Sequence, residues 1–302
     1  MQEKCINSHL LFLENVIEYN TGLGRLIFGV YAATAQQGGC GCWNKLKDKK
    51  EVEGKFIEDI LFKDGSNKTE KEAKDDKIIV GTEAGFAPYE YMKGNEVVGI
   101  DMDIAKAIAD DMGKELEIKN MDFDGALAAV ASGKVDFVAA GVSIDEDRLK
   151  TMDFSHEYVN STEVIVVNGE SPAVTPAGAE LSGSDLDGKV VAVQQGNIAD
   201  IWVSNEEKCK PKEVKRYTKF AQAAEDLKNN KVDCIVMDQY PAEQLVASNG
   251  TLKILDGVLF EDKYAIAVKK GNQELLDKIN KVIDQLIEDG KIEEFTANHT
   301  QK

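Results

Sequence analysis

The sequence predicts an α/β fold made of two similar lobes, each with a mostly parallel β-sheet flanked by helices. Three observations support this prediction. From residue 77 onward, short apolar runs of strand length alternate with amphipathic segments of helix length. One segment recurs, because residues 123–136 align without gaps to residues 220–233. The chain of 302 residues is also long enough for about two domains.

The first half of this region begins with an apolar strand. Residues 77–82 read KIIVGT and end near a glycine, as expected of a buried strand. Residues 101–112 are expected to form an amphipathic helix, since Ile104 and Ile108 lie one turn apart and acidic residues occupy the first turn. The other elements predicted here are strands at 115–119 and 135–140 and a helix at 124–132 that Gly133 ends.

The second half repeats the alternation of strands and helices. Such spacing is typical of βαβ units and of parallel sheets. Both copies of the recurring segment run from a helix through a tight turn into Lys-Val-Asp and a strand. Two α/β lobes explain this repeat, although convergence of helix–turn–strand joints is an alternative. The predicted strands are 189–194, 213–217, 232–237 and 264–268, and the predicted helices are 197–204, 221–229, 241–248 and 273–289.

The composition excludes several classes of partner. The 36 basic and 54 acidic residues give a net charge of −18, nearly all of it after residue 75. A surface this acidic repels phosphate backbones and anionic lipids, so we expect neither nucleic acid nor a membrane surface as a partner. No apolar run reaches the length of a transmembrane helix. Arginine is rare, and its planar fork of donors suits carboxylates; the arginines are Arg25, Arg148 and Arg216.

The first 76 residues differ from the rest and are interpreted as an N-terminal extension. Residues 44–77 are rich in charged side chains and read as a solvated linker, with a short amphipathic helix at 55–63. Arg25 precedes an apolar stretch, an A-x-A triplet and a nearby cysteine, which is the pattern of a degraded secretory signal. An irregular extension explains the same residues about equally well. A separate hypothesis is that the true polypeptide begins near Gly24, directly before this signal-like stretch.

Neither a metal site nor a cofactor is predicted. Cys40 and Cys42 form a C-x-C pair without a second pair or a nearby histidine, which is a weak metal signal. Paired acids occur at two helix starts, and helix capping explains them better than metal binding. No Walker A sequence is present, so we expect no ATP hydrolysis. The paired acids are Asp101 with Asp103 and Asp122 with Asp124.

The predicted strands bring several loops to one cleft. Ligands of open α/β sheets lie beyond the carboxyl ends of the strands. Arg148 and Asp238 both fall in such loops and could hold a carboxylate and an ammonium group. The residues therefore indicate a zwitterionic ligand. The loops cover residues 83–89, 140–148, 194–198 and 237–240.

Residues 77–296 resemble the solute-binding proteins of polar-amino-acid ABC transporters, family 3 of the bacterial extracellular solute-binding proteins. The resemblance implies a two-lobe, periplasmic-binding-protein-like (type II) fold whose lobes are joined by two crossover strands. It divides the chain into a first lobe, 77–167 with 262–302, and a second lobe, 168–261. The motifs that carry it are GTEAGFAPYEY at 81–91, VGIDMDIA at 98–105, AGVSIDEDR at 140–148, MDFS at 152–155, VQQGN at 193–197 and VMD at 236–238.

The resemblance implies that Arg148 binds the α-carboxylate of the ligand as a bidentate fork. The alternative is a surface arginine that pairs with the acids beside it. The backbone N–H of Ser143 and that of Asn197 or Ile198, at a predicted helix start, complete the carboxylate site. Asn197 is also explained as an ordinary helix N-cap, and both roles are compatible.

The resemblance assigns the α-ammonium group to Asp238, with help from the Ser143 hydroxyl and the Gly141 carbonyl. A turn or cap at the strand end is the alternative for Asp238. Further residues surround the ligand side chain, and they favour a polar or basic amino acid. They are Phe86 and Phe123 as walls, with core packing as the alternative for Phe123, Glu83 and Gln194 as polar partners, and Ala140, which leaves room.

The expected function is capture of a free amino acid and its delivery, by hinge closure, to the permease subunits of an ABC transporter. We expect no enzymatic activity, a monomer, and a location outside the cytoplasm, with lipidation of Cys40 or Cys42 left open. The first alternative is a dehydratase of the arogenate or prephenate type on the same fold. A sensor module is the second, and the lack of a membrane helix or kinase-like extension argues against it.

Overall fold

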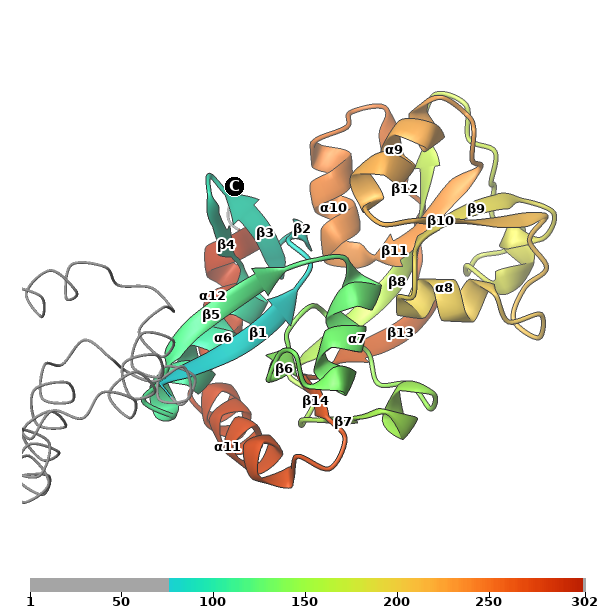
Figure 1. Cartoon of the computed structure of the whole chain (residues 1–302). Helices are drawn as coiled ribbons and strands as arrows, with labels where there is room; N and C mark the ends of the chain where they lie inside the picture. The colour runs from blue at the N-terminus through green and yellow to red at the C-terminus, as the bar shows by residue number, and fades with distance from the viewer. Residues whose placement is uncertain (1–75, 301–302) are drawn as a thin grey trace, which may run out of the picture. The chain divides into compact units, whose positions relative to one another are not determined.

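The computed structural model describes residues 76–300, and these form two lobes, each built on its own sheet (Figure 1). The predicted extension, the helix expected at 55–63 and the C-x-C pair lie outside the described residues. Within the described range, every helix is too short or too polar to cross a bilayer.

The first sheet has the strand order β5-β1-β6-β14-β7. Strand β1 pairs in parallel with β5 and β6, and β14 runs antiparallel to β6 and β7. A small hairpin sheet, β2-β3-β4, follows β1 in the chain. The strands are β1 (Lys77–Thr82), β2 (Gly85–Phe86), β3 (Glu90–Lys93), β4 (Glu96–Val98), β5 (Glu115–Asn120), β6 (Phe137–Val138), β7 (Met152–Phe154) and β14 (Ala267–Lys269).

Helices cover both faces of the first sheet. On one face α6 packs with α11 and α12, and their apolar residues join β1 and β6 in one core. On the other face α7 packs against β1, β6 and β14. The elements are α6 (Ile100–Asp111), α7 (Phe123–Ser132), the short 3-10 helix η2 (Arg148–Lys150), α11 (Gln273–Glu288) and α12 (Lys291–Thr300).

The second sheet has the order β10-β9-β11-β8-β12, with β13 also paired to β8. Strands β9, β10 and β11 are parallel, whereas β8 is antiparallel to β11, β12 and β13. The elements are β8 (Val159–Asn168), η3 (Gly183–Leu186), β9 (Val190–Gln194), α8 (Ile198–Val203), β10 (Glu213–Tyr217), α9 (Phe220–Lys228), β11 (Cys234–Asp238), α10 (Gln239–Ala247), β12 (Leu252–Ile254) and β13 (Phe260–Tyr264).

The fold confirms the predicted α/β class with two lobes, and most of the predicted elements match within a few residues. One strand prediction is wrong. Residues 264–268 do not form a single strand, because β13 ends at Tyr264 in the second sheet and β14 begins at Ala267 in the first. The chain therefore passes between the sheets at residues 265–266 and, earlier, at residues 155–158. The division of the lobes at residues 167 and 262 stays a prediction.

Candidate ligand-binding site between the lobes

A narrow cavity lies where the carboxyl ends of strands from both sheets meet. Ten of the eleven residues predicted for the site line it. The free space between them is about 10 Å³, room for roughly one water molecule. The lining residues are Glu83, Phe86, Phe123, Ala140, Gly141, Ser143, Gln194, Asn197, Ile198 and Asp238, together with Glu90, which sequence reasoning missed.

Arg148, the eleventh predicted residue, lies beside the cavity and is buried, with 7% of its surface exposed. One guanidinium nitrogen donates to the Ser143 carbonyl at 2.6 Å, and the other donates to the Gly196 carbonyl of the second lobe at 2.8 Å. The guanidinium lies 5.5 Å from the centre of the Phe123 ring. Burial argues against a surface arginine held by its acidic neighbours, and the planar fork can reach both lobes.

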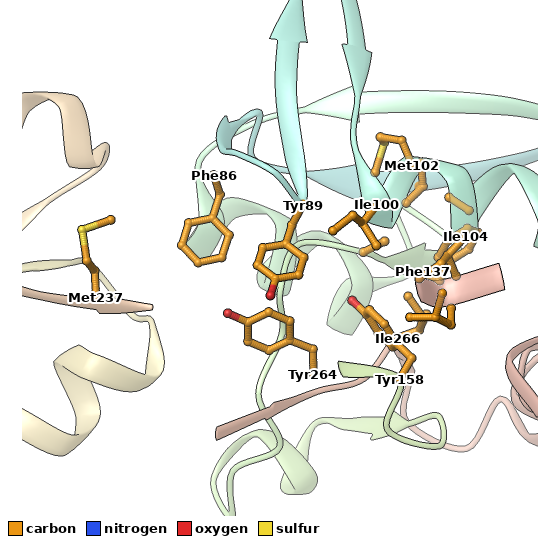
Figure 2. Packing of buried hydrophobic residues seen from close by; sticks show 14 of the residues in the cluster. Phe86, Tyr89, Ile100, Met102, Ile104, Phe137, Tyr158, Met237, Tyr264 and Ile266 are labelled. Carbon is orange, nitrogen blue, oxygen red and sulfur yellow. The ribbon is translucent and has the colours of Figure 1, made fainter. Parts of the chain in front are cut away.

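Asp238 ends strand β11 and is buried, with 3% of its surface exposed. Its Oδ1 atom accepts hydrogen bonds from the Tyr264 hydroxyl and, at 3.0 Å, from the Ser161 hydroxyl. Figure 2 shows the Tyr264 hydroxyl pointing from the aromatic cluster with Phe86 and Tyr89 toward the side of Met237, the neighbour of Asp238 on β11. Burial raises the pKa of Asp238 to about 6. The carboxyl group is thus held in one orientation, and a cation beside it would stabilise its charged form.

Glu83 follows β1 and joins the two lobes at the floor of the site. Its Oε2 atom accepts a hydrogen bond from the Gln194 side chain at 3.1 Å, and Lys219 lies 4.0 Å from Oε1. Glu83 is 2% exposed, and burial raises the pKa of its carboxyl group. A cationic group of a ligand at this place would compensate the cost of burying that charge.

Gly141 and Ser143 form a turn after β6 that other acids hold in place. The Gly141 N–H donates to Asp101 at 2.8 Å, and the Ser143 hydroxyl donates to Asp262 at 2.5 Å. Gly141 has φ of +55°, and a Cβ atom there would lie 2.9 Å from the Phe86 ring. Glycine is therefore required by both the backbone and the close approach of the aromatic wall.

The predicted capping role of the paired acids is met only in position. Asp122 occupies the N-cap of α7, whereas Gly99 occupies that of α6, and no side-chain hydrogen bond caps either helix. Asp101 is instead buried between Gly141 and the Tyr158 hydroxyl, which donates to it at 2.8 Å. Asp124 accepts a hydrogen bond from Gln195 of the second lobe at 2.7 Å. These acids thus position the site and the contact between the lobes.

The predicted cap at α8 is confirmed. The Asn197 side chain accepts a hydrogen bond from the Asp200 N–H at 2.8 Å, while its own N–H donates to the Gln194 carbonyl at 3.3 Å. Helix α8 therefore starts at the cavity wall, where Asn197 and Ile198 both line the space.

Sequence reasoning missed four polar residues around the cavity, of which three are buried and Asp262 is half-buried. Three carboxyl groups have oxygens within 4.8 Å of one another, close enough to share a cation, and they are those of Glu163, Asp238 and Asp262. Glu163 and Glu90 are almost fully buried. A signal existed for Glu163, which is a single acid directly before the apolar run VIVV of β8. The missed residues are Glu90, Glu163, Asp262 and Tyr264.

The balance of charge indicates the chemistry that the site can accommodate. Five buried or nearly buried carboxyl groups line or adjoin the cavity, and Arg148 is the buried cation among the described residues beside it. Such a site favours a ligand with positive charge, while the arginine can bind one carboxylate. The aromatic wall suits the apolar stem of such a ligand. Phe86 stacks on Phe220 of the other lobe, with 6.0 Å between the two ring centres. The carboxyl groups are Glu83, Glu90, Asp238, Glu163 and Asp262.

A two-lobe fold with a polar site between the lobes defines the class of hinge-bending binding proteins. Residues 78–302 match the family model of the bacterial extracellular solute-binding proteins, family 3. The chain belongs to this family, as the resemblance of its motifs predicted.

Known proteins of this kind are similar over most of the chain. The arginine-binding extracellular protein ArtP of Bacillus subtilis is 33% identical, over 76% of this chain and 89% of its own. A mutant of ArgBP from T. maritima is 36% identical, with a TM-score of 0.70 over 77% of this chain and 98% of its own. A third similar protein is the amino acid ABC transporter substrate-binding protein AbpA of Streptococcus pneumoniae, solved bound to L-arginine. It is 32% identical with a TM-score of 0.68, over 77% of this chain and 100% of its own. These relatives are binding proteins.

Proposed function

We propose that the protein captures free L-arginine between its lobes and presents it to the permease of an ABC transporter. One observation carries this proposal: several buried carboxyl groups line the cavity, and the guanidinium of Arg148 is the buried one beside it within residues 76–300. L-arginine carries one carboxylate and two cationic groups. The arginine-binding relatives support the same ligand.

Each group of the ligand has a proposed partner. Arg148 binds the α-carboxylate, together with the N–H groups of Ser143 and of Asn197 or Ile198. Asp238 binds the α-ammonium group, and the Ser143 hydroxyl and Gly141 carbonyl contribute to the same site. Glu83 and Gln194 bind the guanidinium group. Phe86, Phe123 and Ala140 enclose the side-chain stem.

Hinge closure is the proposed mechanism. Ligand pockets commonly measure about 300–1,000 Å³, whereas the present cavity is about 10 Å³, so entry requires the lobes to separate. Hydrogen bonds between the lobes, such as those of Gln194 to Glu83 and Arg148 to Gly196, support the closed form. A ligand that contacts both lobes would shift the population toward a closed form that encloses it, which the permease recognises.

The proposal includes several finer points. The first lobe comprises residues 77–167 with 262–302 and the second comprises 168–261. The protein acts as a monomer outside the cytoplasm, as expected of this family, with lipidation of Cys40 or Cys42 as one means of attachment.

A thermal-shift screen against the twenty amino acids tests the ligand. A specific ligand raises the midpoint of unfolding by mass action, and we expect L-arginine to give the largest rise. Affinity near micromolar corresponds to about −8 kcal/mol. A larger rise with glutamine than with arginine would contradict the assignment of Glu83 to a cationic side chain.

The dehydratase alternative is tested separately. We expect arogenate and prephenate to be recovered unchanged after incubation with the protein, since the relatives are binding proteins. Turnover of either compound, measured by chromatography, would instead support an enzyme.

A further inference from the structure

Two buried carboxyl groups lie directly opposite each other in the second sheet. The antiparallel register of β11 and β8 pairs Asp238 with Glu163. Glu163 is 0% exposed and Asp238 is 3% exposed. Two negative charges opposite each other on adjacent strands destabilise a sheet, and burial increases the cost. The pair therefore requires a compensating positive charge or a proton.

Glu163 lacks any donor that would stabilise a negative charge. Among residues 76–300, neither of its carboxyl oxygens has a hydrogen-bond partner. Asp238, in contrast, accepts hydrogen bonds from Tyr264 and Ser161. When two carboxyl groups share one proton, the proton resides on the group with fewer donors, because the other is better stabilised as a carboxylate.

We propose that Glu163 is a neutral carboxylic acid that shares its proton with Asp238 and thereby keeps Asp238 ionised and oriented toward the ligand. Glu163 is then a positioning residue for the ammonium site. The inference rests on the proposed function, because it assigns the α-ammonium group to Asp238.

The charged and titratable groups around the pair are consistent with one shared proton. Asp262 on β13 lies within 4.8 Å and, as a like charge, raises the pKa values of both Asp238 and Glu163. Burial is the largest cause of both rises. Tyr264 lowers the pKa of Asp238 by donating to it, and the neighbouring Glu163 carboxyl group, when protonated, acts in the same direction. The other groups whose charge interacts with this cluster are Tyr89, Glu90, Glu157 and Arg148.

The sign of the pH dependence follows from Asp238. Its pKa is raised from 3.8 to about 6, so the free protein binds a proton there as the pH falls through 6. An ammonium ligand must displace that proton, and its affinity therefore falls below pH 6. Without the Glu163 O–H donor, the charged form of Asp238 loses support. The loss of affinity then begins at a higher pH.

Calorimetric titration of the full chain with L-arginine, from about pH 5 to about pH 8, tests the proposal with Glu163→Gln and Glu163→Leu. The amide of Glu163→Gln can still donate to Asp238, so its affinity stays within about threefold of the parent at pH 7.5. Glu163→Leu loses the donor. We expect it to bind about tenfold more weakly, and we expect the pH below which its affinity falls to be higher than that of the parent by about one unit.

Three outcomes would overturn the proposal. Glu163→Leu could bind like the parent and lose affinity at the same pH as the parent, which indicates that Glu163 only fills space. Glu163→Gln could lose more than about 100-fold in affinity, which indicates that a negative charge is needed. EDTA or added Ca²⁺ could change the affinity of the parent, which indicates a shared metal ion rather than a proton. Glu274→Gln, which removes an exposed acid paired with Lys278 on α11, is the control.

Infrared spectroscopy separates failure of this proposal from failure of the proposed ligand. At pH 7.5 without ligand, the parent should show the carbonyl band of a protonated carboxyl group that Glu163→Gln lacks. An identical band in both proteins would refute the shared proton whatever amino acid the protein binds.

Discussion

The two lobes contain the same helix–turn–strand joint, and its two copies end differently. In the first lobe the joint runs from α7 into β6, and in the second it runs from α9 into β11. The turn residues at equivalent positions, Gly133 and Asn230, both have positive φ, of 74° and 54°. Asp136 and Asp233 also correspond, and each accepts a backbone N–H of the neighbouring strand at 2.7 Å. The shared sequence therefore encodes the same joint twice.

The copies diverge where the strands reach the cavity. The equivalent positions there are Gly141 and Asp238. The first offers a close backbone turn beside Phe86, and the second offers a buried carboxyl group. The comparison teaches that the repeated helix–turn–strand joint sets the position at which the chain reaches the cavity. The residue at that position, Gly141 or Asp238, then differs between the lobes and offers a different group to a ligand. On the proposed assignment, Arg148 of the first lobe takes the carboxylate and Asp238 of the second lobe takes the ammonium group.

Replacing Arg148 should have the largest effect on this division of roles. In Arg148→Ala the ligand carboxylate loses its bidentate partner, so we expect the affinity for L-arginine to fall by more than about 100-fold in calorimetric titration. Arg216→Ala is the matched control, because Arg216 pairs with Asp200 and does not line the cavity. It should bind within about twofold of the parent. Unchanged affinity of Arg148→Ala would remove the carboxylate assignment.

Asp238→Asn should weaken binding from the other lobe. The ammonium group loses its counter-charge in an enclosed site, which costs about 2–3 kcal/mol, or roughly 30- to 150-fold in affinity. The measurement compares L-arginine with its analogue that lacks the α-amino group. That analogue should bind the parent and Asp238→Asn equally, and weakly. Equal binding of arginine and the analogue to the parent protein would contradict the role.

Gly141→Ala tests why the first joint ends in glycine. Its Cβ atom would lie 2.9 Å from the Phe86 ring, in addition to the strain of positive φ. We expect a loss of about 2–3 kcal/mol in the free energy of unfolding, measured in urea. The control Gly188→Ala has φ of +70° but open space around the added carbon, and should lose only about 1 kcal/mol. Equal losses would mean that contact with Phe86 contributes nothing.

The sequence was sufficient to predict these joints, because periodicity and turn residues are local signals. It also predicted the strand ends, and ten of eleven predicted site residues line one cavity for that reason. The roles of Asp101 and Glu163 could not be predicted. Asp101 reads as a cap because it opens a helix, yet it contacts Gly141, 40 residues away. The pairing of Glu163 with Asp238 depends on strand register, which no local pattern reveals.

The strand predicted at 264–268 failed for a related reason. Residues 265 and 266 are as apolar as a strand interior and are fully buried, so periodicity gives no sign that the chain leaves one sheet there and enters another. Passage between the lobes is a tertiary feature. It is visible only once the partners β8 and β7 are known.

Exchanging the turn residues of the two joints is the subtlest test of their equivalence. Gly133→Asn should cost about 0.5 kcal/mol, because asparagine tolerates positive φ better than other residues with a Cβ atom. Asn230→Gly should cost about 0.5–1 kcal/mol. This variant keeps the conformation but loses the hydrogen bonds that Asn168 and Ser171 donate to the Asn230 side chain at 3.1 and 3.0 Å.

Alanine at either turn position should be worse than the exchange, by about 0.5–1 kcal/mol in urea unfolding, because it introduces the strain of positive φ without the local hydrogen bonding of asparagine. The prediction is therefore an order of stability: in both lobes, the alanine variant should be less stable than the variant with the exchanged residue. The alanine variant could instead be as stable as the exchanged variant at one of the two joints. The left-handed turn would then constrain the sequence of the other lobe only. At the joint without that constraint, side-chain contacts such as those of Asn230 would explain the repeated sequence.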